Sequence, residues 1–154
     1  MKLCILTVGR GGGDWAEEAA RDYGRRIARH TKLDEAHVKA ERYRGDPEKV
    51  RRAEAERLLG RVSPRDRLVV LDERGADLDT RGFADLVQQA RLDGVSRLVF
   101  VIGGPYGFDP SVRSRAWKVV RLSSLVLNHE VARVVLYEQV YRAFTLLAGI
   151  PYHH

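Results

Sequence analysis

The chain has 154 residues, 44% of them hydrophobic and 31% charged, which is usual for a globular protein that buries one substantial core. Its apolar stretches are far shorter than the roughly 20 residues that a membrane-spanning helix needs, so a transmembrane segment is excluded. The net charge of +6 and the pI near 9.8, carried mostly by Arg, favour a polyanionic partner. A coding bias towards Arg is the alternative explanation.

The single cysteine, Cys4, lies in an apolar segment near the N-terminus, so no intrachain disulfide can form. That segment is too short for the hydrophobic part of a signal peptide and lacks a small-residue cleavage site. No linker, repeat or low-complexity stretch divides the chain. We therefore expect a cytoplasmic protein with one domain over residues 1–154.

Strands and helices are predicted to alternate along the whole chain. Unbroken or alternating apolar runs predict strands at residues 2–8, 33–40, 66–72, 97–102 and 118–122. Apolar residues at helical spacing, several of them preceded by an Asp that can cap the first turn, predict helices at residues 14–27, 46–62, 80–93, 109–117 and 130–148. This alternation predicts an α/β fold with a mostly parallel sheet and helices on both of its faces.

Three loops that follow predicted strands are candidates for ligand binding, because ligands of open α/β sheets bind beyond the carboxyl ends of the strands. They are residues 72–75, 103–107 and 123–129. The second holds three glycines around a proline, which makes a stiff turn that a ligand can approach at the backbone. The third is unusually apolar for a loop and could enclose a flat aromatic ligand. A tight turn and a misread strand are the structural alternatives.

A glycine cluster at residues 9–13 follows the first strand, where a dinucleotide-binding fingerprint would lie. The pattern fails because Asp14 stands where the third glycine belongs, and because no acidic residue ends the second strand. The chain also has no GxxxxGK[ST] loop, no HExxH and no Cys/His metal spacing. The sequence therefore argues against a dinucleotide enzyme or an ATPase and predicts no metal site.

The helix predicted at residues 130–148 is apolar on nearly all of its sides. One face carries apolar residues at spacings of three and four, namely Ala132, Leu136, Val140, Ala143 and Leu147. Such a helix needs cover from its own sheet and from a second surface, and a twofold partner is the economical explanation. A central place within one larger core is the alternative.

Several motifs combine in a pattern that is specific to one family. They include Val70-Leu71-Asp72, Val101-Ile102-Gly103-Gly104-Pro105 with Gly107, Gln139-Val140-Tyr141-Arg142-Ala143 and the closing Pro151-Tyr152-His153. In this combination, and over essentially its full length, the chain resembles the SPOUT class of RNA methyltransferases and, within it, the ribosomal RNA large subunit methyltransferase H family. It departs from many relatives at Asn128, where they carry Pro before the histidine.

The resemblance implies an S-adenosylmethionine-dependent enzyme that methylates N3 of a pseudouridine in 23S ribosomal RNA of the large subunit, in the assembled ribosome. It also implies a C-terminal trefoil knot, an exception to the usual absence of threaded chains. The resemblance further implies a homodimer paired through the final helix, with each tail near a composite site. S-adenosylmethionine is then expected in the knot, against Leu71, Gly103, Leu122, Ser123, Ser124, Leu125, Val126 and Leu127.

A uracil-type N3 carries a proton and is a poor nucleophile until that proton leaves, so a general base, or a cation that stabilises the resulting anion, is expected. We expect either His129 or the tail residue His153 to take the proton, with Arg142 and Tyr152 positioning the base or the developing charge. The sequence leaves that choice open, as it leaves open whether His154 is native or the remnant of a tag.

Contacts with the RNA backbone are expected from exposed arginines, for which the candidates are Arg10, Arg21, Arg25, Arg29, Arg42 and Arg44. The alternative function is a non-catalytic RNA- or ribosome-binding protein with the same α/β fold. Binding of S-adenosylmethionine would discriminate between the two, because a pure binder has no reason to keep a pocket for the methyl donor.

Overall fold

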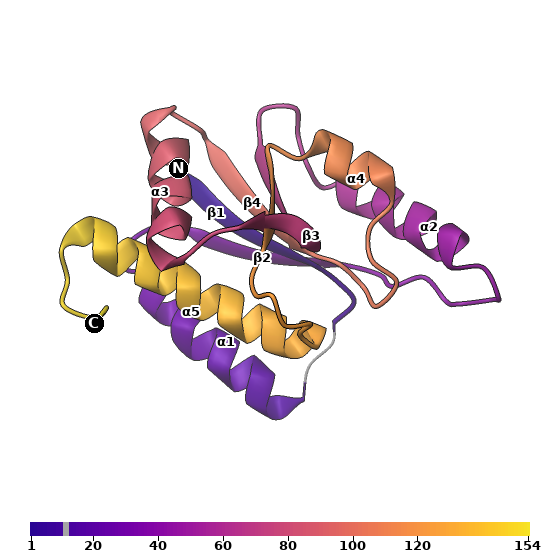
Figure 1. Ribbon diagram of the computed structural model, residues 1–154, viewed down its shortest axis with the longest axis horizontal. Coiled ribbons are helices and arrows are strands. Elements are labelled where there is room, and N and C mark those ends of the chain that lie inside the picture. The colour runs from indigo at the N-terminus through magenta and orange to yellow at the C-terminus, as the bar shows by residue number, and fades with distance from the viewer. Residues whose placement is uncertain (11–12) are drawn as a thin grey trace.

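The computed structural model describes residues 1–10 and 13–154 as a five-stranded sheet with helices on both faces (Figure 1). The strands are β1 (Lys2–Val8), β2 (Leu33–Val38), β3 (Arg67–Asp77), β4 (Arg97–Ile102) and β5 (Lys118–Arg121). The helices are α1 (Asp14–Ile27), α2 (Pro47–Leu59), α3 (Thr80–Leu92), α4 (Pro110–Arg115) and α5 (His129–Ala148). Gly11 and Gly12 of the glycine cluster lie outside the described residues.

The sheet has the strand order β2-β1-β4-β3-β5, and each adjacent pair is parallel. In the centre of the sheet, Phe100 of β4 lies opposite Ile5 of β1 on one side and Val69 of β3 on the other. Apolar runs of this kind suit strands that are buried on both faces, as parallel strands are. The predicted α/β fold is confirmed, and the sheet is fully parallel among the described strands.

Two hydrophobic cores lie on opposite faces of the sheet, since successive strand residues point to opposite sides. Helices α1, α3 and α5 cover one core, which contains Leu98 and Phe100 of β4. Helices α2 and α4 cover the other, which contains Val99 and Val101. In Figure 1, α5 runs beside α1 beneath the sheet, and the C-terminal tail leaves at the end away from α2.

Several helix ends differ from the predicted ones, each for a local reason. Helix α2 ends at Leu59 rather than at residue 62, because Gly60 caps it and the next bonds are short turns. Helix α4 ends at Arg115 rather than at residue 117, because the Trp117 N–H donates to Leu68 O at 2.8 Å and so joins the sheet. Helix α5 begins at His129, one residue earlier than predicted.

Asn128, the departure from the family pattern, is the N-cap of α5. Its Oδ1 accepts the Glu130 N–H at 2.8 Å, and its carbonyl oxygen accepts the Ala132 N–H at 2.8 Å. Asparagine is among the best residues at this position. The replacement of proline therefore leaves the entry into α5 well fixed.

The loop predicted at residues 72–75 is not a loop in the structure, and that prediction is wrong. Strand β3 extends to Asp77, and these residues form a bulge within it. Val120 of β5 lies opposite both Leu71 and Ala76, and the residues between these two leave the ladder. At Gly75 the two backbones touch: a Cβ there would lie 2.5 Å from the carbonyl carbon of Val120. Only glycine permits this approach.

The trefoil knot stays a prediction.

Replacing Gly75 with Ala should destabilise the fold strongly, because the added methyl group would overlap the backbone of β5. Overpacking of this kind costs roughly 1–3 kcal/mol, and therefore lowers Tm by roughly 2–12 °C in a protein of this size. Thermal unfolding followed by circular dichroism measures the change.

The control is Gly24→Ala in α1, where a Cβ would meet the side chains of Leu33 and Tyr137 at 3.6 and 3.7 Å. That distance is ordinary contact, and Ala favours the helix, so this variant should keep or raise Tm. Equal melting temperatures for the two variants would contradict the close approach of β3 and β5.

Candidate functional site

A cavity of about 870 Å³ opens at the carboxyl ends of β3, β4 and β5. Its walls are the bulge of β3 and the segments at the ends of β4 and β5, at residues 71–74, 102–110 and 121–129 without Ser124. Side chains from α2, α4 and the first turn of α5 complete it. This is the edge of the sheet at which the sequence predicts a ligand.

The residues predicted to hold the methyl donor gather in this wall, with one exception. Those that line the cavity are Leu71, Gly103, Leu122, Ser123, Leu125, Val126 and Leu127. Ser124 is exposed and lies outside the wall. The three loops singled out in the sequence therefore meet at one place, as the parallel sheet requires.

The glycine turn after β4 is packed closely from behind. A Cβ on Gly103 would lie 2.8 Å from the ring of Phe108, and one on Gly104 would lie 3.0 Å from Glu54 Oε1. Gly107 has a φ of +79°, which favours glycine. The backbone of this turn, rather than side chains, therefore forms the cavity wall.

The loop after β5 presents apolar side chains at the cavity. Leu125 is 74% exposed and Val126 is 83% exposed, which is costly for aliphatic side chains that have no function. The loop is held locally, since the Leu125 N–H donates to Ser123 Oγ at 2.9 Å. Such a surface suits a flat apolar ligand group that would cover it.

Charged side chains surround this apolar floor. Arg113 of α4 donates to Asp72 at 2.8 Å, which ties the bulge of β3 to the helix across the cavity wall. Arg51, Arg52 and Arg74 also line the cavity. Arginine is suited to phosphate, so an anionic ligand or substrate is favoured near this mouth.

Glu54 is a buried residue behind the glycine turn that the sequence reading missed. Its side chain is 3% exposed; Oε2 accepts the Glu41 N–H at 3.1 Å, and Oε1 has no partner among the described residues. Burial raises the pKa of this carboxyl above its usual 4.5, and the bond from Glu41 opposes the shift. One signal was available: Val50, Glu54 and Leu58 follow one another at a spacing of four on the apolar stripe of α2.

His129 is the only one of the four predicted catalytic residues in the described cavity wall. It is the first residue of α5, and its side chain is exposed. Within residues 1–10 and 13–154, its imidazole makes no hydrogen bond or ion pair with a protein side chain. It is therefore accessible to a substrate at the cavity.

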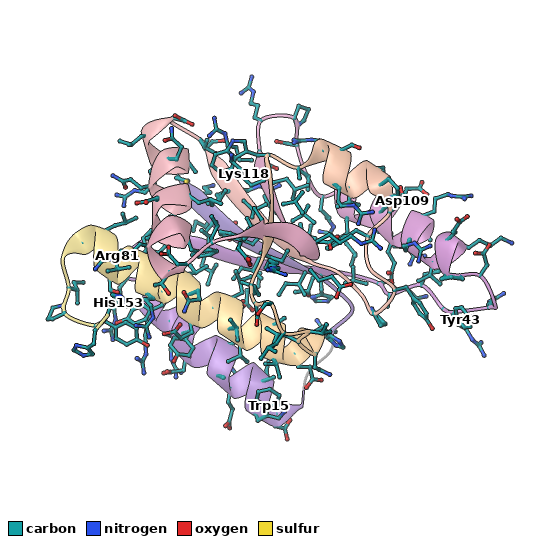
Figure 2. The ribbon with its side chains drawn as sticks, viewed as in Figure 1. Trp15, Tyr43, Arg81, Asp109, Lys118 and His153 are labelled. Atoms are coloured by element: carbon teal, nitrogen blue, oxygen red, sulfur yellow. The ribbon has the colours of Figure 1, made fainter. Side chains whose placement is uncertain are left out.

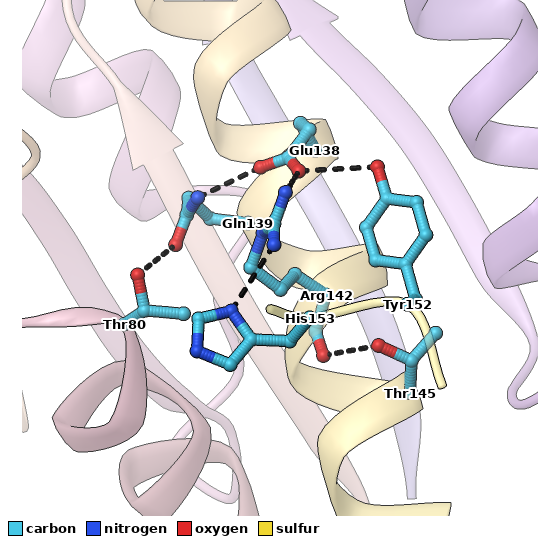
Figure 3. A network of polar contacts seen from close by, with 7 residues as sticks. All are labelled: Thr80, Glu138, Gln139, Arg142, Thr145, Tyr152 and His153. Carbon is cyan, nitrogen blue, oxygen red and sulfur yellow. Dashed lines mark hydrogen bonds and ion pairs between the residues drawn. The ribbon is translucent and has the colours of Figure 1, made fainter. Parts of the chain in front are cut away.

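Arg142, Tyr152 and His153 form a separate network at the other end of α5 (Figure 3). Glu138 accepts from Arg142 Nε at 2.9 Å and from Tyr152 OH at 3.2 Å, while Arg142 Nη1 lies 3.1 Å from His153 Nδ1. Thirteen residues separate His129 from Arg142, or about 20 Å along the helix. A single chain thus does not bring the four predicted catalytic residues together.

Two features of this network limit its chemistry. Burial, together with Tyr23 and Glu138, raises the pKa of Tyr152 to about 12, so its hydroxyl remains a donor at neutral pH. A guanidinium can only donate, so His153 accepts at Nδ1 and its own ring proton lies on Nε2. In this arrangement, neither residue is free to accept a proton.

Residues 1–153 match a family model described as "Predicted SPOUT methyltransferase". The chain belongs to the SPOUT methyltransferase family. It is 44% identical over 154 residues to the ribosomal RNA large subunit methyltransferase H of Trichlorobacter lovleyi, with 100% of each chain covered. It is 40% identical to the protein of that name from Geotalea uraniireducens, also with 100% of each covered. These relatives confirm the resemblance to the ribosomal RNA large subunit methyltransferase H family.

A solved structure described as "Crystal structure of an hypothetical protein" shares the fold of this SPOUT family member. It has a TM-score of 0.57 and 19% identity, and the match covers 95% of this chain and 68% of the other. Among the described residues, no group of three or more His, Cys, Asp or Glu side chains could hold a metal ion. None of the described helices combines the length and apolar character needed to cross a membrane.

Replacing Glu54 with Gln should raise Tm increasingly as the pH rises. The folded state holds the Glu54 proton more tightly than the unfolded chain, so the free energy of unfolding falls as pH rises above the usual pKa of 4.5. Gln keeps the acceptor for the Glu41 N–H and removes the charge. Melting curves between about pH 4 and pH 8 measure the difference.

Glu56→Gln is the matched control, since Glu56 is an exposed carboxylate on the same helix. Its effect on Tm should be small at every pH. If Glu54→Gln shifted Tm equally at both ends of the pH range, burial of the Glu54 charge would not be the cause.

Proposed function

We propose that this protein transfers a methyl group from S-adenosylmethionine to N3 of a pseudouridine in 23S ribosomal RNA of the large subunit. The observation that carries the proposal is full-length identity of 40–44% with relatives named ribosomal RNA large subunit methyltransferase H. The cavity of backbone turns and apolar side chains supports it. A ribosomal RNA substrate implies a cytoplasmic protein.

The described residues fit the methyl donor. Leu71, Gly103 and the loop from Leu122 to Leu127 would hold an adenosyl group between backbone atoms and aliphatic side chains. The absence of a Cβ at Gly103 and Gly104 lets the turn pack against Phe108 and Glu54, so that its backbone lines the cavity. When bound, S-adenosylmethionine supplies an electrophilic methyl group. The contribution of the protein is to align the acceptor and to exclude water.

The acceptor must lose its N3 proton, and His129 is the residue we assign to remove it. It lines the cavity and presents a free imidazole there, whereas His153 is engaged by Arg142. A histidine is suited to this exchange near neutral pH. Arg142 and Tyr152 then act through position and charge rather than as bases.

The distance between His129 and the tail network leads us to propose a homodimer. If two copies pair through α5, the tail of one protomer can lie at the cavity of the other and complete the site. The α5 helix retains half-buried apolar residues, among them Val134, Val135 and Leu147, beside the more exposed Val131. A twofold axis at this helix would cover them.

Mapping of ribosomal RNA modifications by mass spectrometry tests the activity. In a strain that lacks the gene, one pseudouridine of 23S rRNA should lose its methyl group, and the purified protein with S-adenosylmethionine should restore it on isolated ribosomes. Isothermal titration should show binding of S-adenosylmethionine. A protein that binds RNA but not the donor would establish the non-catalytic alternative.

Truncation after Pro151 should abolish methyl transfer while binding of S-adenosylmethionine persists, because the removed residues lie in the network with Arg142 and not in the cavity of their own chain.

His129→Asn should reduce turnover by roughly 10²–10⁴-fold, the usual contribution of a general base. Raising the pH should partly rescue His129→Asn, because N3 then ionises without help.

The control is His154→Ala, which changes an exposed terminal residue. It should leave turnover unchanged. Full activity of the truncated protein would remove the tail from the mechanism, and full activity of His129→Asn would remove the assigned base.

A further inference from the structure

Two exposed tyrosines stack at the outer rim of the cavity. The rings of Tyr43 and Tyr106 have centroids 5.1 Å apart and planes 14° apart. Tyr43 remains 50% exposed and Tyr106 remains 40% exposed. Tyr106 lines the cavity, whereas Tyr43 lies outside its wall, on the side of α2 (Figure 2).

The segment that carries Tyr43 is fastened to α2 by three hydrogen bonds, two of them part-buried and one exposed. Glu54 accepts the Glu41 N–H, and Arg57 donates both to Lys39 O at 2.9 Å and to the Glu41 carboxylate at 2.7 Å. These contacts fix the loop just before Tyr43. The backbone that carries Tyr43 is therefore held in place by α2.

The second tyrosine is fastened from the same helix. Arg51 of α2 donates to Tyr106 O at 3.3 Å, and the glycine turn that carries Tyr106 lies against Glu54. Both rings are thus positioned by α2, although they come from loops 63 residues apart in the chain. Fixed aromatic rings bind a planar partner at little cost in conformational entropy.

Positive charge surrounds the stack. Arg42 and Arg44 flank Tyr43, are exposed, and form none of the ion pairs found in the described part of the chain. Arg51 and Arg52 stand on the adjacent cavity wall, accompanied by the acidic Glu48. An aromatic pair with arginine side chains nearby matches a nucleotide, because a nucleotide has a planar base beside a phosphate.

We propose that the Tyr43–Tyr106 stack binds an unpaired RNA base next to the nucleotide being methylated, while Arg42 and Arg44 contact the neighbouring phosphates. The inference rests on the proposed function for its choice of RNA. Single-stranded RNA is recognised in this way, with splayed bases stacked on aromatic side chains. Because the stack adjoins the cavity mouth, a base held there lies beside the target nucleotide.

The test measures binding of a fluorescein-labelled single-stranded oligouridylate to the full-length protein by fluorescence anisotropy. A second probe of the same length lacks its bases and keeps only ribose and phosphate. The wild-type protein should bind the first probe more tightly than the second. Tyr43→Ala should lose roughly 5- to 100-fold in affinity for the first probe and nothing for the second, whereas Tyr43→Phe should bind as the wild type does.

Arginine variants separate charge from stacking. Arg42→Ala should weaken binding of both probes alike and lower the salt dependence. Arg65→Ala, which removes another exposed arginine just before the amino end of β3, should change neither. Melting curves and titration with S-adenosylmethionine should be unchanged in Tyr43→Ala, because Tyr43 is outside the cavity wall.

The inference is overturned if the wild type shows no preference for the probe with bases, or if Tyr43→Ala binds it as tightly as the wild type. These outcomes are distinct from failure of the proposed function. If the protein binds the probe with bases but transfers no methyl group, the proposed methyltransferase activity is wrong. If Tyr43→Ala methylates ribosomes as the wild type does, only the proposed role of the stack is wrong.

Discussion

Contact between the backbones of β3 and β5 determines where the cavity forms. At Gly75 the bulged strand lies directly on Val120, so the segments leaving β3 and β5 emerge side by side. Strand β4 runs parallel to β3 in the same sheet and delivers the glycine turn to the same edge. Three chain segments that are distant in sequence therefore line one cavity. Their arrangement depends on the pairing of the strands and not on any single side chain.

The two faces of the sheet serve different purposes in this arrangement. On one face, α5 packs with α1 and α3 over the larger core and carries both His129 and the tail network at its two ends. On the other, α2 covers the smaller core and supports the rim of the cavity through Glu54 and Arg51. Helix α5 thus reaches from the cavity to the tail, and α2 supports the rim of the cavity.

Much of the fold could be predicted because it follows from local patterns. The apolar run of β4 and the Asp46 and Asp109 caps mark elements that begin where the sequence predicts them, and β3 begins within one residue of its predicted start. The bulge in β3 escaped prediction, since it depends on contact with β5 across the sheet. The pairing of Asp72 with Arg113 and the burial of Glu54 are likewise tertiary effects. The likeness to a family indicated most of the cavity residues, whereas it left open which of His129 and His153 faces the cavity of its own chain.

Glu138 is the common acceptor for the tail, receiving hydrogen bonds from Gln139, Arg142 and Tyr152. Residues that share one partner form a coupled unit, in which removal of the first member already weakens the rest. Substitutions within this group are therefore non-additive. The energetic contribution of any one of these side chains can therefore be measured only against a background in which its partners are also varied.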